Sequence, residues 1–428
     1  MIFSPGLLLV LAAAASLPEG IPGPAPAPQS TDAPGDLAPL GEEPALPGVV
    51  REVTIFGNVK TTRHVILREL GWHAGTAIDD HAWHLGLTRL QNTMLFNLIE
   101  AHRVEAGPGQ FDAVIHVQEN FTLYPSLNAV ASSDLFWLSA GVSEFNLFGA
   151  FRELRAQYER YNDEHGGQLG YRDPRLFDER LDFSVVGGRF ARPRPTFTLL
   201  RLFAQTELAR LLNDDHLRVG LRAEVGHDEY TAAIDGTSAS NTPSAYGILS
   251  APTRLGRIDR IRVDFDGQSL EVTPSVIAGG GARGFFPSFS AAGLFYKQGP
   301  GRTNLAVRVL GGATGASTSN FRMYIGGLET VRGFPDSYAN GTQYAAANIE
   351  LRWTAFDSKY LAIQPAAFVD GAAMGNERQG HGRLLSAGAG VRFICPVFAQ
   401  AGIRIDLAER LIGGSGLGLS VGAYQFFF

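Results

Sequence analysis

The chain has 428 residues, a net charge of −6 and 18% charged residues. This balance gives no electrostatic reason to expect a nucleic-acid partner. Helical apolar periodicity is confined to residues 61–96, which argues against a soluble α/β enzyme. After the first residues no apolar run approaches the roughly 20 residues of a membrane-spanning helix. A membrane barrel stays open, because alternating lipid-facing and lumen-facing residues average to a hydropathy near zero.

The start of the chain predicts export. Residues 6–15 form a short apolar core followed by small residues, so residues 1–16 are interpreted as a secretory signal peptide. No basic residue precedes Arg51, which departs from the usual positive start, and an apolar tail of a cytosolic protein is the alternative. Residues 17–48 are rich in Pro, Ala and Gly and predict a linker that cannot bury enough apolar surface to fold.

Residues 49–119 predict a small α/β domain with the order strand, helix, helix, strand, strand. Thr61 or Thr62 is placed to cap a first helix that Gly71 ends, and Asp79 or Asp80 to cap a second. Residues at three- and four-residue spacing give the second helix its apolar face: Trp83, Leu87, Leu90, Met94 and Leu95. Two strands are predicted at 99–105 and 111–117, separated by a Gly-Pro-Gly turn.

Several positions of this region resemble a polypeptide-transport-associated (POTRA) domain. They are Ile55-Phe56-Gly57-Asn58, Gly75, Leu90, Leu95-Phe96 and Val117-Gln118-Glu119. The resemblance implies a two-helix layer on a three-stranded sheet, located in the periplasm. It also implies a sheet edge that receives an extended client strand.

Residues 120–428 contain about sixteen strand-like runs separated by turn residues, enough for transmembrane strands of about 9–11 residues each. Apolar and charged residues alternate in several of them, as in 217–225, 348–353 and 403–407. The predicted fold is therefore mostly β, a 16-stranded antiparallel transmembrane β-barrel preceded by one small α/β POTRA domain. The terminal aromatics Tyr424, Phe426 and Phe428 resemble the C-terminal signal by which outer-membrane barrels are recognised for insertion.

The most informative segment contains Val331-Arg332-Gly333-Phe334. With the strands that follow, it resembles the BamA/TamA-type superfamily of outer-membrane assembly and translocation proteins, also called the bacterial surface antigen family, which includes the two-partner secretion transporters. The resemblance implies a loop between strands eleven and twelve that folds into the lumen, where its arginine reaches acidic residues of the wall. Asp370 is the expected partner, Glu350 a second acceptor, and Phe368 shares the face of Asp370. The alternative is a surface turn with an ordinary Arg-Gly dipeptide.

These features predict a protein that inserts or translocates polypeptides. Its expected partners are unfolded or partly folded client polypeptides, outer-membrane lipid, and periplasmic chaperones or lipoproteins. A passive porin-like channel and a lipid-handling barrel are the alternatives. No enzyme, cofactor or metal site is predicted, because the Gly-x-Gly-x-x-Gly match at 279–284 lacks a strand-to-helix context and Cys395 lies in a strand-like run.

Overall fold

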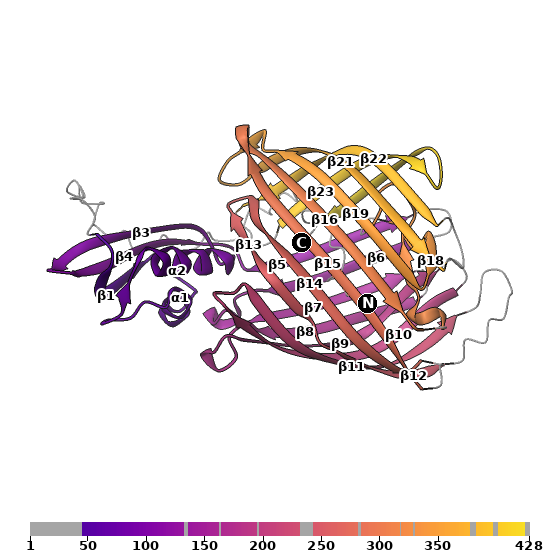
Figure 1. Ribbon diagram of the computed structural model, residues 1–428, viewed down its shortest axis with the longest axis horizontal. Coiled ribbons are helices and arrows are strands. Elements are labelled where there is room, and N and C mark those ends of the chain that lie inside the picture. The colour runs from indigo at the N-terminus through magenta and orange to yellow at the C-terminus, as the bar shows by residue number, and fades with distance from the viewer. Residues whose placement is uncertain are drawn as a thin grey trace, which may run out of the picture.

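A computed structural model describes residues 45–131, 136–161, 164–194, 197–231, 243–280, 284–316, 318–327, 330–376, 382–396 and 401–423. The predicted signal peptide, most of the predicted linker, and Tyr424, Phe426 and Phe428 lie outside these residues. A small α/β domain sits at one end of a long β-barrel (Figure 1). Neither α-helix in the described ranges is long and apolar enough to cross a membrane.

The small domain has a four-stranded sheet in the order β2-β1-β4-β3, with two helices packed on it. Its elements are β1 (Gly48–Phe56), α1 (Arg63–Leu70), β2 (Ala77–Ile78), α2 (Asp80–Asn92), β3 (Phe96–Gly107) and β4 (Gln110–Glu119). The predicted order is observed, with the short β2 added. In the core, Trp72 stacks on Trp83 with 4.1 Å between ring centroids. Burial of such large aromatic surfaces contributes much of the stability of a domain this small.

Local signals set the ends of both helices. Thr62 caps α1 by accepting a hydrogen bond from the amide of Val65, and Gly71 ends it with a left-handed φ of 71°. Asp79 caps α2 by accepting from the amide of Ala82. The prediction that this helix continues through Met94 and Leu95 is wrong, because Met94 has a φ of 60° and α2 ends at Asn92. Such a φ interrupts the helical hydrogen-bond pattern.

Within the described ranges, eighteen strands close the barrel: β5 (Leu123–Ala131), β6 (Phe136–Glu144), β7 (Glu153–Tyr161), β8 (Glu164–Asp173), β9 (Leu181–Arg194), β10 (Phe197–Leu212), β11 (Leu217–Thr231), β12 (Ser244–Ser250), β13 (Thr253–Ile261), β14 (Asp264–Gly279), β15 (Phe285–Gly299), β16 (Thr303–Thr314), β19 (Gln343–Trp353), β20 (Phe356–Asp357), β21 (Ala362–Gly375), β22 (Arg383–Cys395), β23 (Ala401–Ile412) and β24 (Leu417–Ala423). Strands β12 and β13 both pair with β11 and β14, and β19 and β20 both pair with β21. Each of these two pairs is one interrupted strand of the wall. When each interrupted strand is counted once, the barrel has sixteen strands, as predicted.

The barrel has charged side chains inside and apolar side chains outside. On β19, Glu350 and Arg352 are buried, whereas Ile349 and Leu351 on the opposite face are 51% and 52% exposed. Strands β11 and β23 repeat this arrangement. An antiparallel sandwich in water buries its apolar face instead. The exposed apolar face therefore contacts lipid, and the barrel spans a membrane.

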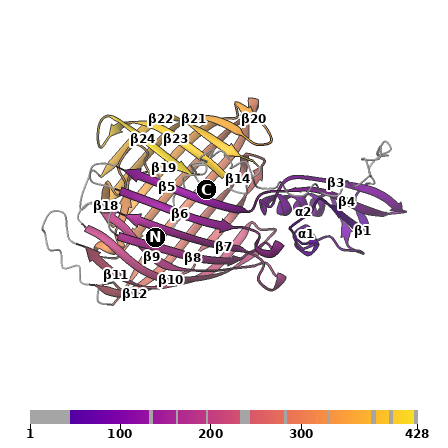
Figure 2. The ribbon, with the colours of Figure 1, turned by 180° about the vertical axis from the view of Figure 1, so that it is seen from behind.

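The even number of barrel strands brings the end of β24 to the side on which β5 begins, next to the small domain. Strands β5 and β24 are neighbours in the closed order, and Figure 2 shows the first and last strands of the barrel on the same side of the wall. Short turns connect the strands on the side of the small domain. Two of these turns contain the 3-10 helices η1 (Leu147–Gly149) and η2 (Leu176–Asp178), and a third contains η3 (Pro300–Arg302).

Candidate functional site: a loop latched inside the barrel

A long connection between β16 and β19 starts at the end of the barrel away from the small domain. It joins the eleventh and twelfth barrel strands, the position expected from the sequence. The loop contains η4 (Ser319–Phe321) and a two-stranded hairpin of β17 (Met323–Ile325) and β18 (Ala339–Gly341). Residues of this loop contact lumen-facing side chains of the wall, so the loop folds back into the barrel.

Arg332 lies at the centre of the loop contacts and is fully buried. Its Nε and Nη2 atoms donate to the two carboxylate oxygens of Asp370 at 2.7 and 2.8 Å, which is a bidentate pair. Its Nη1 atom donates to Glu350 at 2.6 Å and lies 3.5 Å from Asp406. The guanidinium also lies 3.4 Å from the ring centroid of Phe368. The structure thus brings together all three wall residues singled out in the sequence.

The carboxylates that hold Arg332 are themselves held by the wall. Arg392 on β22 donates to Glu350 at 2.7 and 3.1 Å and to Asp406 on β23. Arg352 donates to Oε1 of Glu350 at 2.8 Å, an oxygen that also accepts from Arg392. All of these side chains are at most 1% exposed. A buried charge network of this kind is tolerated only when each member has partners, so it specifies one position for the loop.

Two glycines make room for this network. A Cβ at position 390 would lie 2.0 Å from a carboxylate oxygen of Asp406, so only glycine lets Arg392 and Asp406 meet beside it. Gly333 has a φ of 88°, and its Cβ would lie 2.9 Å from that of Ala408. The motif therefore needs glycine directly after its arginine.

The apolar residues of the motif pack on the barrel wall. Val331 is fully buried and Phe334 is 5% exposed. They belong to one apolar cluster with the loop hairpin and two wall strands: Ile325, Val331, Phe334, Ala339, Met374 and Leu384. Burial of these side chains stabilises the docked loop by the hydrophobic effect, in addition to the charge network.

The first limb of the loop has a second attachment, which the sequence did not indicate. Asn320 donates to Asp228 of β11 at 2.7 Å, and Arg201 of β10 forms a bidentate pair with the same carboxylate. Phe321 meets Tyr246 of β12 edge to face at 5.5 Å, and the Arg201 guanidinium lies over both rings. These strands are distant in the barrel order from the wall that binds Arg332. The loop is therefore also held on a part of the wall away from the Arg332 network.

The tip of the loop also contacts the last two strands. Arg410 of β23 donates to the carbonyl oxygen of Gly333 at 2.6 Å, and the Tyr338 hydroxyl donates to that of Gly413 at 2.7 Å. A Cβ at Gly418 of β24 would lie 2.4 Å from the same Gly333 oxygen. The motif thus touches the strand that closes the barrel against β5.

The small domain is joined to the turns at its end of the barrel by ion pairs. On the α1 side, Glu69 accepts from Arg175 at 2.6 and 3.1 Å, and Asp178 accepts from His64 and Arg68, both at 2.9 Å. These donors lower the pKa of the Asp178 carboxyl, with the His64 hydrogen bond as the largest cause.

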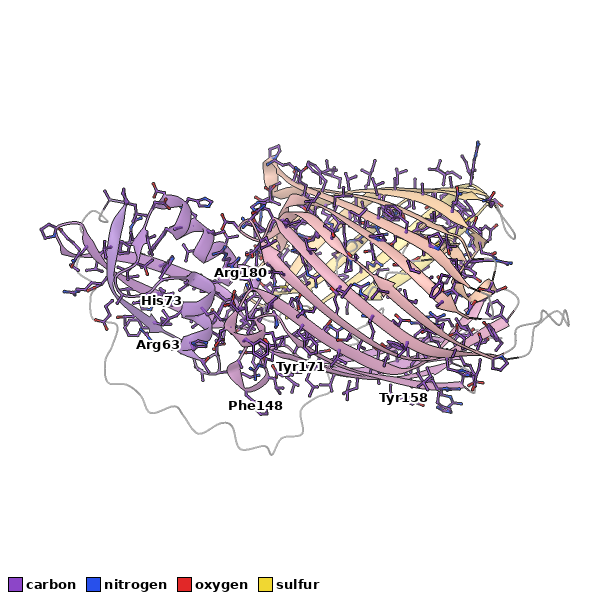
Figure 3. All side chains as sticks on the ribbon, turned by 60° about the horizontal axis from the view of Figure 1, so that its bottom comes forward. Arg63, His73, Phe148, Tyr158, Tyr171 and Arg180 are labelled. Carbon is purple, nitrogen blue, oxygen red and sulfur yellow. The ribbon has the colours of Figure 1, made fainter. Side chains whose placement is uncertain are left out.

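The α2 side uses the same chemistry on another turn. Asp214 accepts from His81 at 3.3 Å and from Arg89 at 3.1 Å, and Asp215 accepts from Arg89 and Arg180. Figure 3 labels Arg180 where the small domain meets the barrel. The His81 hydrogen bond is the largest cause that lowers the pKa of Asp214. Among the described residues, no group of three or more His, Cys, Asp or Glu is arranged to hold a metal ion.

Solved structures with a similar fold are outer-membrane proteins. Over 88% of this chain, the fold matches CdiB from Escherichia coli (TM-score 0.62, 14% identity, 75% of that chain), CdiB from Acinetobacter baumannii (0.57, 15%, 74%) and BamA from Haemophilus ducreyi lacking POTRA domains 1-3 (0.54, 15%, 85%). This likeness shows that the chain has the fold of these proteins, in agreement with the inverted polarity of a barrel wall that spans a membrane.

A family model matches part of the chain. Residues 317–393 match the model of the haemolysin secretion/activation proteins ShlB/FhaC/HecB, which confirms the resemblance seen in the sequence. The matched segment runs from the base of the loop through Arg332, Glu350, Phe368 and Asp370 to Arg392. No match was found among curated proteins.

Proposed function

We propose that this protein moves polypeptide clients across the outer membrane, and that Arg332 latches the loop in the resting barrel. The main support for the proposal is that one segment of the chain both matches a secretion family and contains most of the latch. The segment that matches a secretion family, residues 317–393, contains Arg332 and every charged residue of the buried network around it except Asp406. A passive channel has no need to bury this arginine among three carboxylates of the wall, because burial of charges costs free energy unless geometry repays it.

We propose further that the small domain acts as a POTRA domain that binds the client first. Its sheet ends at β3, a 12-residue strand that pairs only with β4 among the described residues. Leu98 and Val104 on this strand are 46% and 41% exposed. An exposed strand edge with apolar side chains suits the addition of an extended client strand.

The test compares the secreted and outer-membrane proteomes of four strains. One lacks the gene, one carries Arg332→Ala, one lacks residues 49–119, and a control carries Arg302→Ala, a turn residue outside the latch. We expect one or a few secreted proteins to disappear in the first three strains only. Loss of many outer-membrane barrels instead would indicate an insertion role. An unchanged proteome in the gene deletion would contradict transport and favour a passive channel.

A further inference from the structure

A cavity of about 400 Å³ lies between the small domain and the barrel lumen. Its lining comes from the C-terminal end of α2, from the adjoining turns, and from β8, β9, β10, β11, β13, β14 and β15. Six arginines line it: Arg89, Arg172, Arg175, Arg218, Arg254 and Arg257. Three carboxylates do so as well: Asp182, Asp215 and Glu271. The lining therefore has three more positive than negative side chains.

Most of these arginines are fixed by carboxylates. Arg172 forms a bidentate pair with Asp182 at 2.9 Å, and Arg218 donates to Asp182 and to Glu207. Arg257 lies 2.7 Å from Asp259, and the pairs of Arg89 and Arg175 are those of the domain contact described above. Such pairs hold the guanidinium groups in place around the cavity.

Arg254 is the exception. In the register of the wall it lies between Arg218 on β11 and Glu271 on β14. Its Nε atom is buried and has no hydrogen-bond partner among the described residues. An unsatisfied buried donor costs free energy, which a carboxylate ligand would recover through charge-assisted hydrogen bonds. The neighbouring guanidinium of Arg218 adds to the attraction for an anion.

The position of the cavity indicates what kind of anion reaches it. On the opposite face of the same strands, Leu255 and Leu270 are 50% and 46% exposed and contact lipid. Arg254 and Glu271 therefore face the lumen, where the wall separates them from lipid headgroups. The other side of the cavity is the end of α2, at Asn92 and Thr93. A chain that leaves the small domain for the lumen meets this cavity at the barrel entrance.

We propose that this cavity is the first lumenal binding site for the client and that it takes a carboxylate side chain of an extended acidic segment, with Arg254 as the main ligand. The inference rests on the proposed function, because it assumes that a polypeptide enters the lumen. It adds to the proposed function that the client segment that enters first is acidic.

The test measures binding of a fluorescent Gly/Ser-rich peptide with several glutamates to the full-length protein in non-ionic detergent, by anisotropy. The same peptide with glutamines in their place is the ligand control. We expect Arg254→Gln to weaken binding of the glutamate peptide about tenfold, the loss expected for one charge-assisted contact. Arg302→Gln, which removes an arginine outside the cavity, should bind like the wild type. Added salt should weaken the wild-type interaction.

A second variant separates loss of the site from misfolding. Glu271→Gln removes a negative charge that lies beside Arg254 in the register of the wall and repels a carboxylate ligand, so it should tighten binding of the glutamate peptide, a gain that a misfolded barrel would not show. The inference is overturned if both variants bind like the wild type, or if micelles of an anionic phospholipid compete as well as the peptide. If gene deletion still removes a secreted protein in that case, the proposed function stands without this site. The variants can also behave as expected while no secreted protein depends on the gene. In that case the site binds anions, but its ligand is not a transported client.

Discussion

Arg332 has more contacts with the wall than a single salt bridge supplies. Removing it leaves Asp370, Glu350 and Asp406 buried with less positive charge around them, although Arg392 still holds two of the three. Loss of one partner of a buried pair is more costly than loss of the whole pair, because the remaining charge is desolvated without compensation. Asp370 is therefore expected to account for most of the free-energy cost of removing Arg332.

We predict that Arg332→Ala destabilises the folded barrel by ~3–5 kcal/mol, measured by urea unfolding in detergent micelles. Arg332→Lys keeps the charge but loses the planar bidentate geometry, so it should lie between this variant and the wild type. Arg302→Ala, at an exposed turn, should change stability by less than about 1 kcal/mol. A double-mutant cycle with Asp370→Asn should give a non-additive result. Additive effects would contradict direct coupling between the two side chains.

At the scale of the loop, the two attachments differ in kind. The Arg332 attachment joins several charged residues, whereas the first limb is held by Asn320 and Phe321 on a wall that has its own ion pair, Arg201 with Asp228. Removal of Asn320 leaves that pair intact. Removal of Arg201 leaves Asp228 buried with a neutral partner only.

We therefore predict an order of effects at the second attachment. Asn320→Ala should cost about 1 kcal/mol, the net value of one hydrogen bond, and Arg201→Ala should cost ~3–5 kcal/mol. Hydrogen exchange should rise in residues 318–322 in both variants and change little in residues 330–338. Equal effects of the two substitutions would contradict the view that Arg201 organises this attachment.

The sequence allowed the first attachment to be predicted and not the second. Alternation along a strand places Phe368 and Asp370 on one face, and the motif resemblance supplies the arginine that faces them. Asn320 and Asp228 are 92 positions apart, and their meeting depends on barrel closure and on the path of the loop across the lumen. No short-range pattern contains that information. The same holds for the register that places Arg254 between Arg218 and Glu271.

On the scale of the whole molecule, the small domain and the barrel are joined mainly by polar contacts. A close approach occurs at Gly149, whose carbonyl oxygen accepts from the amide of Thr62 at 3.0 Å and whose φ of 72° favours glycine. The other contacts are ion pairs: the carboxylates of Asp178 and Asp214 are exposed, whereas Glu69 is buried. We expect these contacts to hold the small domain in place at neutral pH. They should weaken when their charges are screened or neutralised.

Acid should release the small domain. The pKa values of Asp178 and Asp214 are lowered by partners on the small domain, which are His64 and Arg68 for the first and His81 and Arg89 for the second. Carboxylates with a lowered pKa stabilise the docked state fully above their free pKa, about 4, and lose this contribution as the pH falls through the docked value. We therefore expect docking to be unchanged between pH 7 and 5 and to weaken below about pH 4.

Spin-label distances between Gln110→Cys and Lys359→Cys, in a Cys395→Ser background, measure this release, because both positions are exposed and lie on the two parts of the molecule. The distance distribution should be narrow at pH 7 and broaden at acid pH, while heat-modifiable gel migration shows that the barrel stays folded. The variant Asp178→Asn with Asp214→Asn lacks the titrating groups and should be broadened already at pH 7. A narrow distribution in this variant would show that these carboxylates do not hold the domain, and that Glu69 with Arg175 suffices.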